Sequence, residues 1–266
     1  MARSALLNVM VAAALKAGRT LARDFGEVEN LQVSVKGPGD FVSAADRRSE
    51  KIIIDELRKA RPTYGFLTEE TGEIRGDDDR TNRWIVDPLD GTTNFLHGIP
   101  IFSISIALER NDEIVAGVVY NPIMNELFVA EKGTGAFFND RRIRVSSRTE
   151  LKEAVIATGI PHLGRPAQDE FLGELGFLMR QVSGVRRCGS AALDLSWVAA
   201  GRFDGFWEHG LSPWDIAAGI VILREAGGIV TDGEGTPRAL TGSSIVAASG
   251  PLHPLLRAAL SGRSER

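Results

Sequence analysis

Residues 84–95 read Trp-Ile-Val-Asp-Pro-Leu-Asp-Gly-Thr-Thr-Asn-Phe, an apolar run followed at once by acidic and turn-forming residues. The apolar run predicts a buried strand. Pro88 interrupts regular strand pairing, and Gly91 permits a backbone path that other residues avoid. Thr92 and Thr93 then suit the first positions of a helix. The stretch therefore predicts a strand, a tight turn and a helix in immediate succession.

The same turn carries two carboxylates, Asp87 and Asp90. A turn of this shape would aim both carboxylates and a backbone carbonyl at one point, which is the oxygen-rich environment that hard divalent cations prefer. It would also direct free backbone N–H groups to that point, which suits a phosphate group. The alternative is an ordinary turn with a helix cap, because Asp, Pro and Gly dominate turns in general.

Three further acidic residues lie at the ends of predicted elements. Glu69 and Glu70 follow a short predicted strand at residues 65–68, where a solvated turn is the competing explanation. Asp215 lies at the start of a long apolar helix predicted at residues 213–226, a position that the helix dipole favours in any protein. An acid at that junction would also lie at the edge of a sheet, where the ligands of open α/β sheets bind.

The rest of the pattern divides the chain into two halves. A period-2 pattern over residues 102–145 predicts an antiparallel meander, and alternating helices and strands follow it. We therefore expect a layered α/β protein in which helix and sheet layers alternate as an αβαβα sandwich. Two subdomains, residues 1–145 and 146–266, are expected to form one tightly fused unit. Residues 71–83 are polar and glycine-containing, which predicts a poorly ordered loop.

Composition narrows the expected partners and compartment. The formal net charge of −4 gives no general attraction to nucleic acid or to anionic membranes, so neither is an expected partner. Cys188 is the one cysteine, which excludes an intrachain disulfide and fits a reducing cytoplasm. The N-terminal helix is amphipathic, and no apolar segment reaches the about 18 residues that span a bilayer. We therefore expect neither a signal peptide nor a membrane segment.

Together these motifs resemble the inositol monophosphatase family over nearly the whole chain. The segments that carry the resemblance are residues 36–46, 69–70, 87–95, 120–128, 189–192 and 214–228. The resemblance implies an Mg²⁺-dependent phosphomonoesterase that hydrolyses inositol 1-phosphate to inositol and phosphate by means of a metal-activated water. It also implies a cytoplasmic, lithium-sensitive homodimer.

The resemblance further implies a role for individual residues. Two to three Mg²⁺ ions per subunit would be held by Glu69, Asp87, the Leu89 carbonyl, Asp90 and Asp215. The residues implied in catalysis are Glu69 together with Asp46 and Thr92, which would orient the attacking water. The substrate, a phosphorylated cyclitol or sugar, would contact Gly91, Thr92, Gly189, Ser190, Ala191, Glu208 and Asp215. Lys36 and Glu70 would hold these residues in place without contacting the ions or the substrate themselves.

Several alternatives remain open. A haloacid-dehalogenase-type phosphatase uses Asp-x-Asp-Gly-Thr, whereas the spacing here is Asp-x-x-Asp-Gly-Thr and would misplace the acid pair. Within the family, the substrate could be fructose 1,6-bisphosphate, histidinol phosphate or a 3′-phosphonucleotide. Some bacterial members bind the transcription machinery, a role that need not depend on catalysis. The four histidines lack metal-ligand spacing and are predicted to be structural or exposed.

Overall fold

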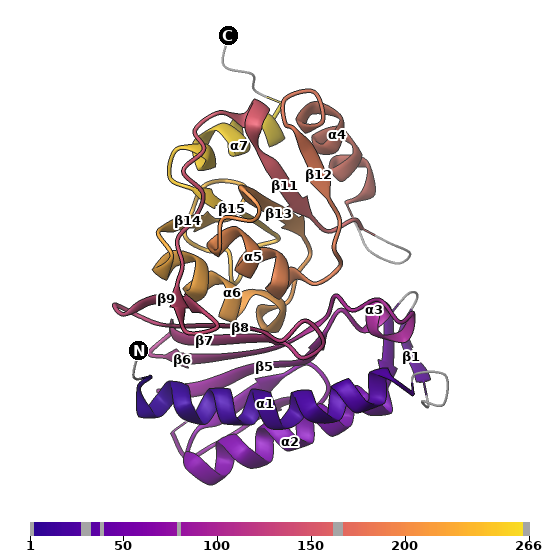
Figure 1. Cartoon of the computed structure of the whole chain (residues 1–266), viewed down its shortest axis with the longest axis vertical. Coiled ribbons are helices and arrows are strands. Elements are labelled where there is room, and N and C mark those ends of the chain that lie inside the picture. Colours follow the sequence, from indigo (N-terminus) through magenta and orange to yellow (C-terminus); the bar gives the residue numbers. More distant parts are fainter. Residues whose placement is uncertain (1–2, 28–32, 38–39, 79–80, 162–166, 263–266) are drawn as a thin grey trace.

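The chain folds into five alternating layers of helices and sheets (Figure 1). The computed structural model describes residues 3–27, 33–37, 40–78, 81–161 and 167–262, with the backbone alone for residues 33–37 and 40–43. The helix layers are α1 (Ala5–Phe25) with α2 (Ala44–Ala60), α5 (Ala191–Ala199) with α6 (Pro213–Glu225), and α4 (Gln168–Leu178) with α7 (Leu252–Leu260). The predicted αβαβα sandwich is confirmed.

An eight-stranded sheet lies between the α1–α2 layer and the α5–α6 layer. Its strands, in spatial order, are β10 (Arg141–Arg142), β9 (Gly135–Phe138), β8 (Glu126–Glu131), β7 (Glu113–Asn121), β6 (Ser103–Arg110), β5 (Asn82–Asp90), β3 (Gly65–Thr68) and β4 (Gly72–Ile74). All neighbours are antiparallel except β3 and β5. The predicted meander therefore corresponds to β6 through β10.

A five-stranded sheet separates α5 and α6 from α4 and α7. Its spatial order is β12 (Gly184–Arg186), β11 (Val155–Thr158), β13 (Gly205–His209), β15 (Ser244–Ser249) and β14 (Gly228–Thr231). Sequence reasoning missed β11, which is defined by its pairing with β12 and β13. It also missed the hairpin of β1 (Val33–Gly37) and β2 (Asp40–Ser43) and the 3₁₀ turn Leu151–Glu153.

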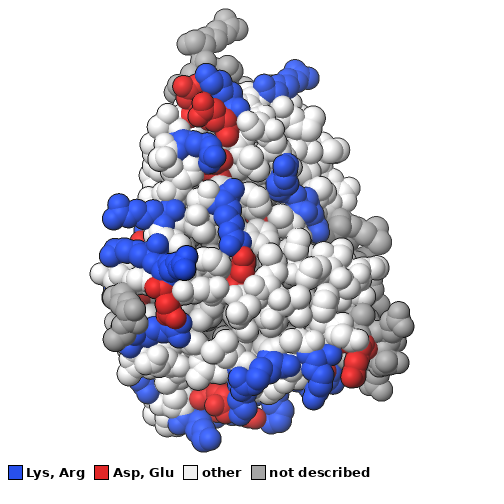
Figure 2. Space-filling model, viewed as in Figure 1, with Lys and Arg blue, Asp and Glu red and all other residues white. Residues whose placement is uncertain are grey.

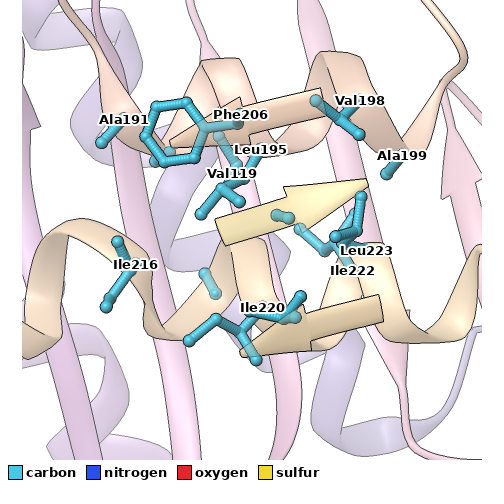
Figure 3. Close-up of a cluster of buried hydrophobic side chains, with 14 of the residues drawn as sticks. Val119, Ala191, Leu195, Val198, Ala199, Phe206, Ile216, Ile220, Ile222 and Leu223 are labelled. Atoms are coloured by element: carbon cyan, nitrogen blue, oxygen red, sulfur yellow. The ribbon is translucent and has the colours of Figure 1, made fainter. Parts of the chain in front are cut away.

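The two sheets share the helices between them. Every residue of α5 and residues 216–223 of α6 are buried, as expected for helices that are apolar nearly all round. Figure 3 shows Ile220 and Ile222 of α6 in one cluster with Leu195 of α5 and Val119 of β7. Each such Ile or Leu contributes about 1.5–3 kcal/mol by burial. The division of the chain near residue 145 stays a prediction, but one helix pair packs against both sheets.

Helix α1 differs from its prediction in one respect. It is 21 residues long, with a window of mean hydropathy 1.3, so by length and composition it could cross a membrane. In the structure its apolar face, which includes Met10, Ala14, Ala17 and Leu21, is fully buried against α2 and the eight-stranded sheet. The apolar face of α1 is thus part of the protein core.

The segment predicted as a poorly ordered loop, residues 71–83, is partly strand. Gly72–Ile74 form β4 and pair with β3, and β5 already begins at Asn82. The prediction was wrong for these residues, because backbone pairing with β3 outweighs their polar composition; residues 79–80 lie outside the described part.

Over the face shown in Figure 2, basic side chains are interspersed with acidic ones.

Candidate active site

A pocket of about 160 Å³ is lined by residues from both sheets and from distant parts of the chain. The predicted site residues that line it are Glu69, Asp87, Leu89, Asp90, Gly91, Thr92, Gly189, Ser190, Ala191, Glu208 and Asp215. Glu69 follows the end of β3, and others lie in the last residues of β5 and β13. The rest lie at the beginnings of α3 (Thr92–Leu96), α5 and α6. The structure therefore brings together the two sequence motifs that hold Asp90 and Asp215.

Strand β5 continues through the predicted turn to Asp90, and α3 follows it directly. The pairing of β5 with β6 is regular to Asp87 and resumes at Asp90, so the residues between them bulge out of the sheet. Asp87 Oδ1 accepts the Leu89 N–H at 2.9 Å, which fixes the carboxylate against the bulge. Gly91 adopts φ 98°, and a Cβ there would lie 3.0 Å from the Ile101 carbonyl oxygen. Only glycine fits this conformation without strain.

Asp90 is held by the first turn of α5. Its Oδ2 accepts the Ser190 hydroxyl at 2.6 Å and the Ala192 N–H at 2.8 Å. Burial raises the pKa of Asp90 to about 6, although these hydrogen bonds oppose the shift. The carboxylate therefore has both strong donors and an unfavourable, water-poor environment.

Asp87 is a second buried carboxylate of the pocket whose pKa is raised. Burial raises its pKa well above the ordinary value, and the nearby charges of Glu69, Asp90 and Asp215 raise it further. The four predicted carboxylates are thus close enough to repel one another. A divalent cation would remove this repulsion, because hard cations bind clustered carboxylate oxygens.

Asp215 lies at the beginning of α6, where Pro213 starts the helix. Its Oδ2 accepts the Ser212 N–H at 2.8 Å as part of a capping box. Ser105 of β6 donates to the Trp214 carbonyl oxygen at 3.1 Å, which ties this end of α6 to the eight-stranded sheet. The helix start therefore has a capping role and also places Asp215 in the pocket.

Comparison with known proteins identifies the family. The model described as "Inositol monophosphatase family" matches residues 2–265. The chain belongs to the inositol monophosphatase family. It is 66% identical over 247 residues to the inositol-1-monophosphatase of Mesorhizobium japonicum, a match that covers 93% of this chain and 92% of that protein.

Two further comparisons agree with this family. A crystal structure of the extragenic suppressor protein suhB from Bartonella henselae matches with a TM-score of 0.94 and 61% identity, covering 97% of this chain and 98% of that one. The chain is also 44% identical over 242 residues to Nus factor SuhB of Escherichia coli K12, covering 91% of this chain and 90% of that protein. Inositol monophosphatases are metal-dependent, generally using Mg²⁺.

The pocket fits the metal that this family uses. Its carboxylate-bearing residues are Glu69, Asp87, Asp90, Glu208 and Asp215. Arg187 is the one lysine or arginine among the described residues that line it. Oxygen donors of this kind suit Mg²⁺, and the excess of negative charge in a partly buried pocket calls for cations.

Asp46 and Thr92 form a pair beside the pocket. Thr92 Oγ1 lies 3.0 Å from Asp46 Oδ1 and 3.1 Å from the Leu89 carbonyl oxygen, and both oxygens can accept its proton. Asp46 is fully buried at the start of α2 and does not itself line the pocket. It reaches the pocket through Thr92.

The remaining predicted residues have different outcomes. Glu70 lies beside the pocket rather than in its wall, and its N–H donates to Glu50 of α2 at 2.9 Å. The side chain of Lys36 lies outside the described residues. Glu208 packs against Gly159, where a Cβ would lie 1.9 Å from the Glu208 Cδ, so Gly159 makes room for this carboxylate.

Sequence reasoning missed several lining residues, among them Arg187 and His209. His209 Nε2 lies 2.8 Å from Glu174 Oε2, and this hydrogen bond raises the His209 pKa. Candidate ligand atoms of Glu170, Glu174 and His209 all lie within 4.8 Å of one another, whereas among the described residues the four predicted carboxylates are not clustered so tightly. The i, i+4 spacing of Glu170 and Glu174 was the signal of this group that the sequence offered. The histidine comes from β13, so only the folded structure shows that it joins the two glutamates.

Proposed function

We propose that this chain is an Mg²⁺-dependent phosphatase that hydrolyses inositol 1-phosphate to inositol and phosphate. The observation that carries the proposal is the convergence of Glu69, Asp87, Asp90 and Asp215 on one pocket, where three of them raise the pKa of Asp87. A phosphate dianion would be repelled from such a pocket unless cations neutralised it. Inositol phosphate is favoured as the substrate because relatives at 66% and 63% identity are named inositol-1-monophosphatases.

The proposed metal ligands come from both halves of the chain and line the same pocket. Glu69, Asp87 and the Leu89 carbonyl would hold one Mg²⁺, while Asp87, Asp90 and Asp215 would hold a second, and a third ion would bind more weakly near Glu69. When bound, the ions neutralise the phosphate oxygens, activate a water and stabilise the leaving alkoxide. Asp87 would be shared between two ions, so its position matters most.

The Thr92–Asp46 pair would orient the attacking water. A hydroxyl has one proton to donate, so Thr92 can satisfy either Asp46 or the Leu89 carbonyl, but not both. If the Leu89 carbonyl oxygen binds a metal ion, the Thr92 hydroxyl donates its hydrogen bond to Asp46 instead. The lone pairs of Thr92 Oγ1 are then available to accept a hydrogen bond from water, and buried Asp46 fixes their direction.

Substrate contacts would come from both sides of the pocket. The backbone N–H groups of Gly91 and Thr92 would bind the phosphate, and Glu208 would accept hydrogen bonds from cyclitol hydroxyls. Gly189, Ser190 and Ala191 would line the same subsite. Because Ser190 also binds Asp90, the substrate subsite and the metal subsite share one helix start.

The decisive experiment measures phosphate release from a panel of phosphorylated cyclitols, sugars and nucleotides, each with Mg²⁺ or with EDTA. Inositol 1-phosphate should be the preferred substrate, activity should require Mg²⁺, and lithium should inhibit it. Preference for fructose 1,6-bisphosphate, histidinol phosphate or a 3′-phosphonucleotide would redirect the substrate assignment. A trapped aspartyl-phosphate on Asp87 would instead support a haloacid-dehalogenase-type mechanism.

A second role rests on the 44% identity to a protein named Nus factor SuhB. We propose that this chain, as a cytoplasmic homodimer, also binds a component of the transcription machinery. The test is a pull-down with RNA polymerase components, using the wild type and the Asp87→Asn variant in parallel. Retention by both proteins would support a role independent of catalysis, and retention by neither would remove this candidate.

A further inference from the structure

The turn that carries Glu69 is attached to helix α2 through one buried carboxylate, that of Glu50. Glu50 Oε2 accepts the Glu70 N–H at 2.9 Å and the Thr71 N–H at 3.4 Å, while Oε1 pairs with the Thr71 hydroxyl. The residue is 3% exposed. Three donors from two consecutive residues therefore converge on one side chain.

The other side of the same turn is attached to β5. The Glu69 N–H donates to the Val86 carbonyl oxygen at 3.2 Å, directly before Asp87 in the chain. Glu69 thus lies between two anchors, its own bond to β5 and the bonds of the next two residues to Glu50. Of the two, only the Glu50 anchor depends on a side chain.

We propose that Glu50 is a positioning residue that holds Glu69 at the distance from Asp87 needed for shared metal binding. The inference rests on the proposed metal-dependent function. Hydrogen bonds to an ionised acceptor are stronger and shorter than neutral ones, so a carboxylate is well suited to fix a turn. Groups that orient metal ligands typically change metal affinity or activity by about 10–100-fold when removed.

The competing explanation is that Glu50 only satisfies the backbone of a turn. In that case its loss would lower the melting temperature by the same amount with and without Mg²⁺. If it positions Glu69, its loss would also weaken Mg²⁺ binding, so that the Mg²⁺-induced rise in melting temperature would shrink.

Three variants separate these explanations. Glu50→Ala removes all three acceptor interactions, and Thr71→Val removes the hydroxyl interaction alone. Glu50→Gln keeps an oxygen for the two N–H groups and presents its NH₂ group to the Thr71 hydroxyl, which can accept as well as donate. Glu56→Ala is the matched control, because it deletes a glutamate of the same helix whose partner is exposed Lys16.

The experiment measures the half-saturating Mg²⁺ concentration for phosphate release, Mg²⁺ binding by calorimetry, and melting with and without Mg²⁺. We expect about a tenfold or larger loss of Mg²⁺ affinity for Glu50→Ala. Glu50→Gln and Thr71→Val should lie between that variant and the wild type, and Glu56→Ala should match the wild type.

The outcomes distinguish this inference from the function on which it rests. If the wild type neither binds Mg²⁺ nor needs it for activity, the proposed function fails. If the wild type does both and Glu50→Ala binds Mg²⁺ equally well, the positioning role is wrong. Should Glu50→Ala not fold, Thr71→Val becomes the deciding variant, because it removes an interaction that Glu50→Gln can keep. Unchanged Mg²⁺ affinity in Thr71→Val would then overturn the positioning role.

Discussion

The hydroxyl of Ser190 donates a 2.6 Å hydrogen bond to Asp90, a residue 100 positions earlier in the chain. This contact joins the start of α5 to the end of β5. It also places a helix N-terminus, with its partial positive charge, against the carboxylate. The second half of the chain thereby opposes the rise that burial causes in the pKa of Asp90, a carboxylic acid that the first half supplies.

Ser190→Ala should weaken Mg²⁺ binding. The variant leaves the Ala192 N–H on Asp90 but removes its shortest hydrogen bond, and loss of such a supporting group typically costs about tenfold or more in metal affinity. The half-saturating Mg²⁺ concentration is the measurement. Ser196→Ala is the control, since that hydroxyl lies on the same helix and donates to the Ala192 carbonyl oxygen. Equal Mg²⁺ affinity in the two variants would contradict the prediction.

Asp87→Asn should lower turnover by several orders of magnitude while the fold stays intact, because one residue would serve two ions. In EDTA the variant should melt at a higher temperature than the wild type, since it removes a buried charge that three carboxylates repel. The asparagine oxygen can still accept the Leu89 N–H.

Added Mg²⁺ should raise the melting temperature of the wild type by linkage and should have little effect on Asp87→Asn. Turnover and melting with and without Mg²⁺ measure both effects. An active Asp87→Asn enzyme would count heavily against the proposed metal centre.

Asp194→Asn should stabilise the protein near neutral pH. Asp194 is buried in α5, and the Cys188 thiol, a weak donor, is the one hydrogen-bond partner of its carboxylate among the described residues. Burial raises its pKa well above the ordinary value, and the charge of Glu208 adds to the effect. A raised carboxyl pKa favours folding below the unfolded pKa, about 3.9, and this contribution is lost as pH rises through the folded pKa.

The melting temperature of Asp194→Asn should therefore exceed that of the wild type by at least about 2 °C near pH 7.5. The difference should disappear as pH falls towards 4. Melting curves of both proteins across this range provide the test. A variant that is destabilised at every pH would show that the carboxyl group has a partner-dependent role instead.

The pairing of His209 with Glu174 should make stability depend on pH in the opposite sense to an ordinary aspartate. The hydrogen bond to Glu174 raises the His209 pKa. The pair should therefore contribute fully below the unfolded pKa of about 6.5 and lose its contribution as pH rises through the folded pKa.

His209→Gln should consequently reduce the melting temperature more at pH 6 than at pH 8.5. Glu174→Gln should produce the same pH pattern, because it removes the other partner. Equal losses at both pH values would mean that His209 contributes by packing alone.

Much of the site could be predicted because its chemistry lies in compact motifs. The stretch from Asp87 to Gly91 is local, so the strand before it and the unusual backbone at Gly91 could be predicted, whereas the bulge that carries β5 on to Asp90 was not. Asp215 was predicted at a helix start, and a capping box does hold it there. The fold class followed from the order of periodic segments.

The features that sequence reasoning missed depend on contacts between distant elements. Glu50 lies in an ordinary amphipathic helix, and only the folded structure shows that the turn after β3 binds it. Strand β11 is four residues long and is defined by its neighbours β12 and β13. His209 gains its hydrogen bond to Glu174 only because α4 packs beside β13.

Helix α6 has a consequence for how the enzyme reaches its working form. It is enclosed by two sheets, and its first turn carries Asp215. If Asp87, Asp90 and Asp215 share an ion as proposed, neither half of the polypeptide alone supplies all of its ligands. A nascent chain would then complete that site only after residue 215 has been synthesised and docked. Catalytic competence would be a late reporter of assembly, and separating the halves would abolish it even if each kept its own sheet.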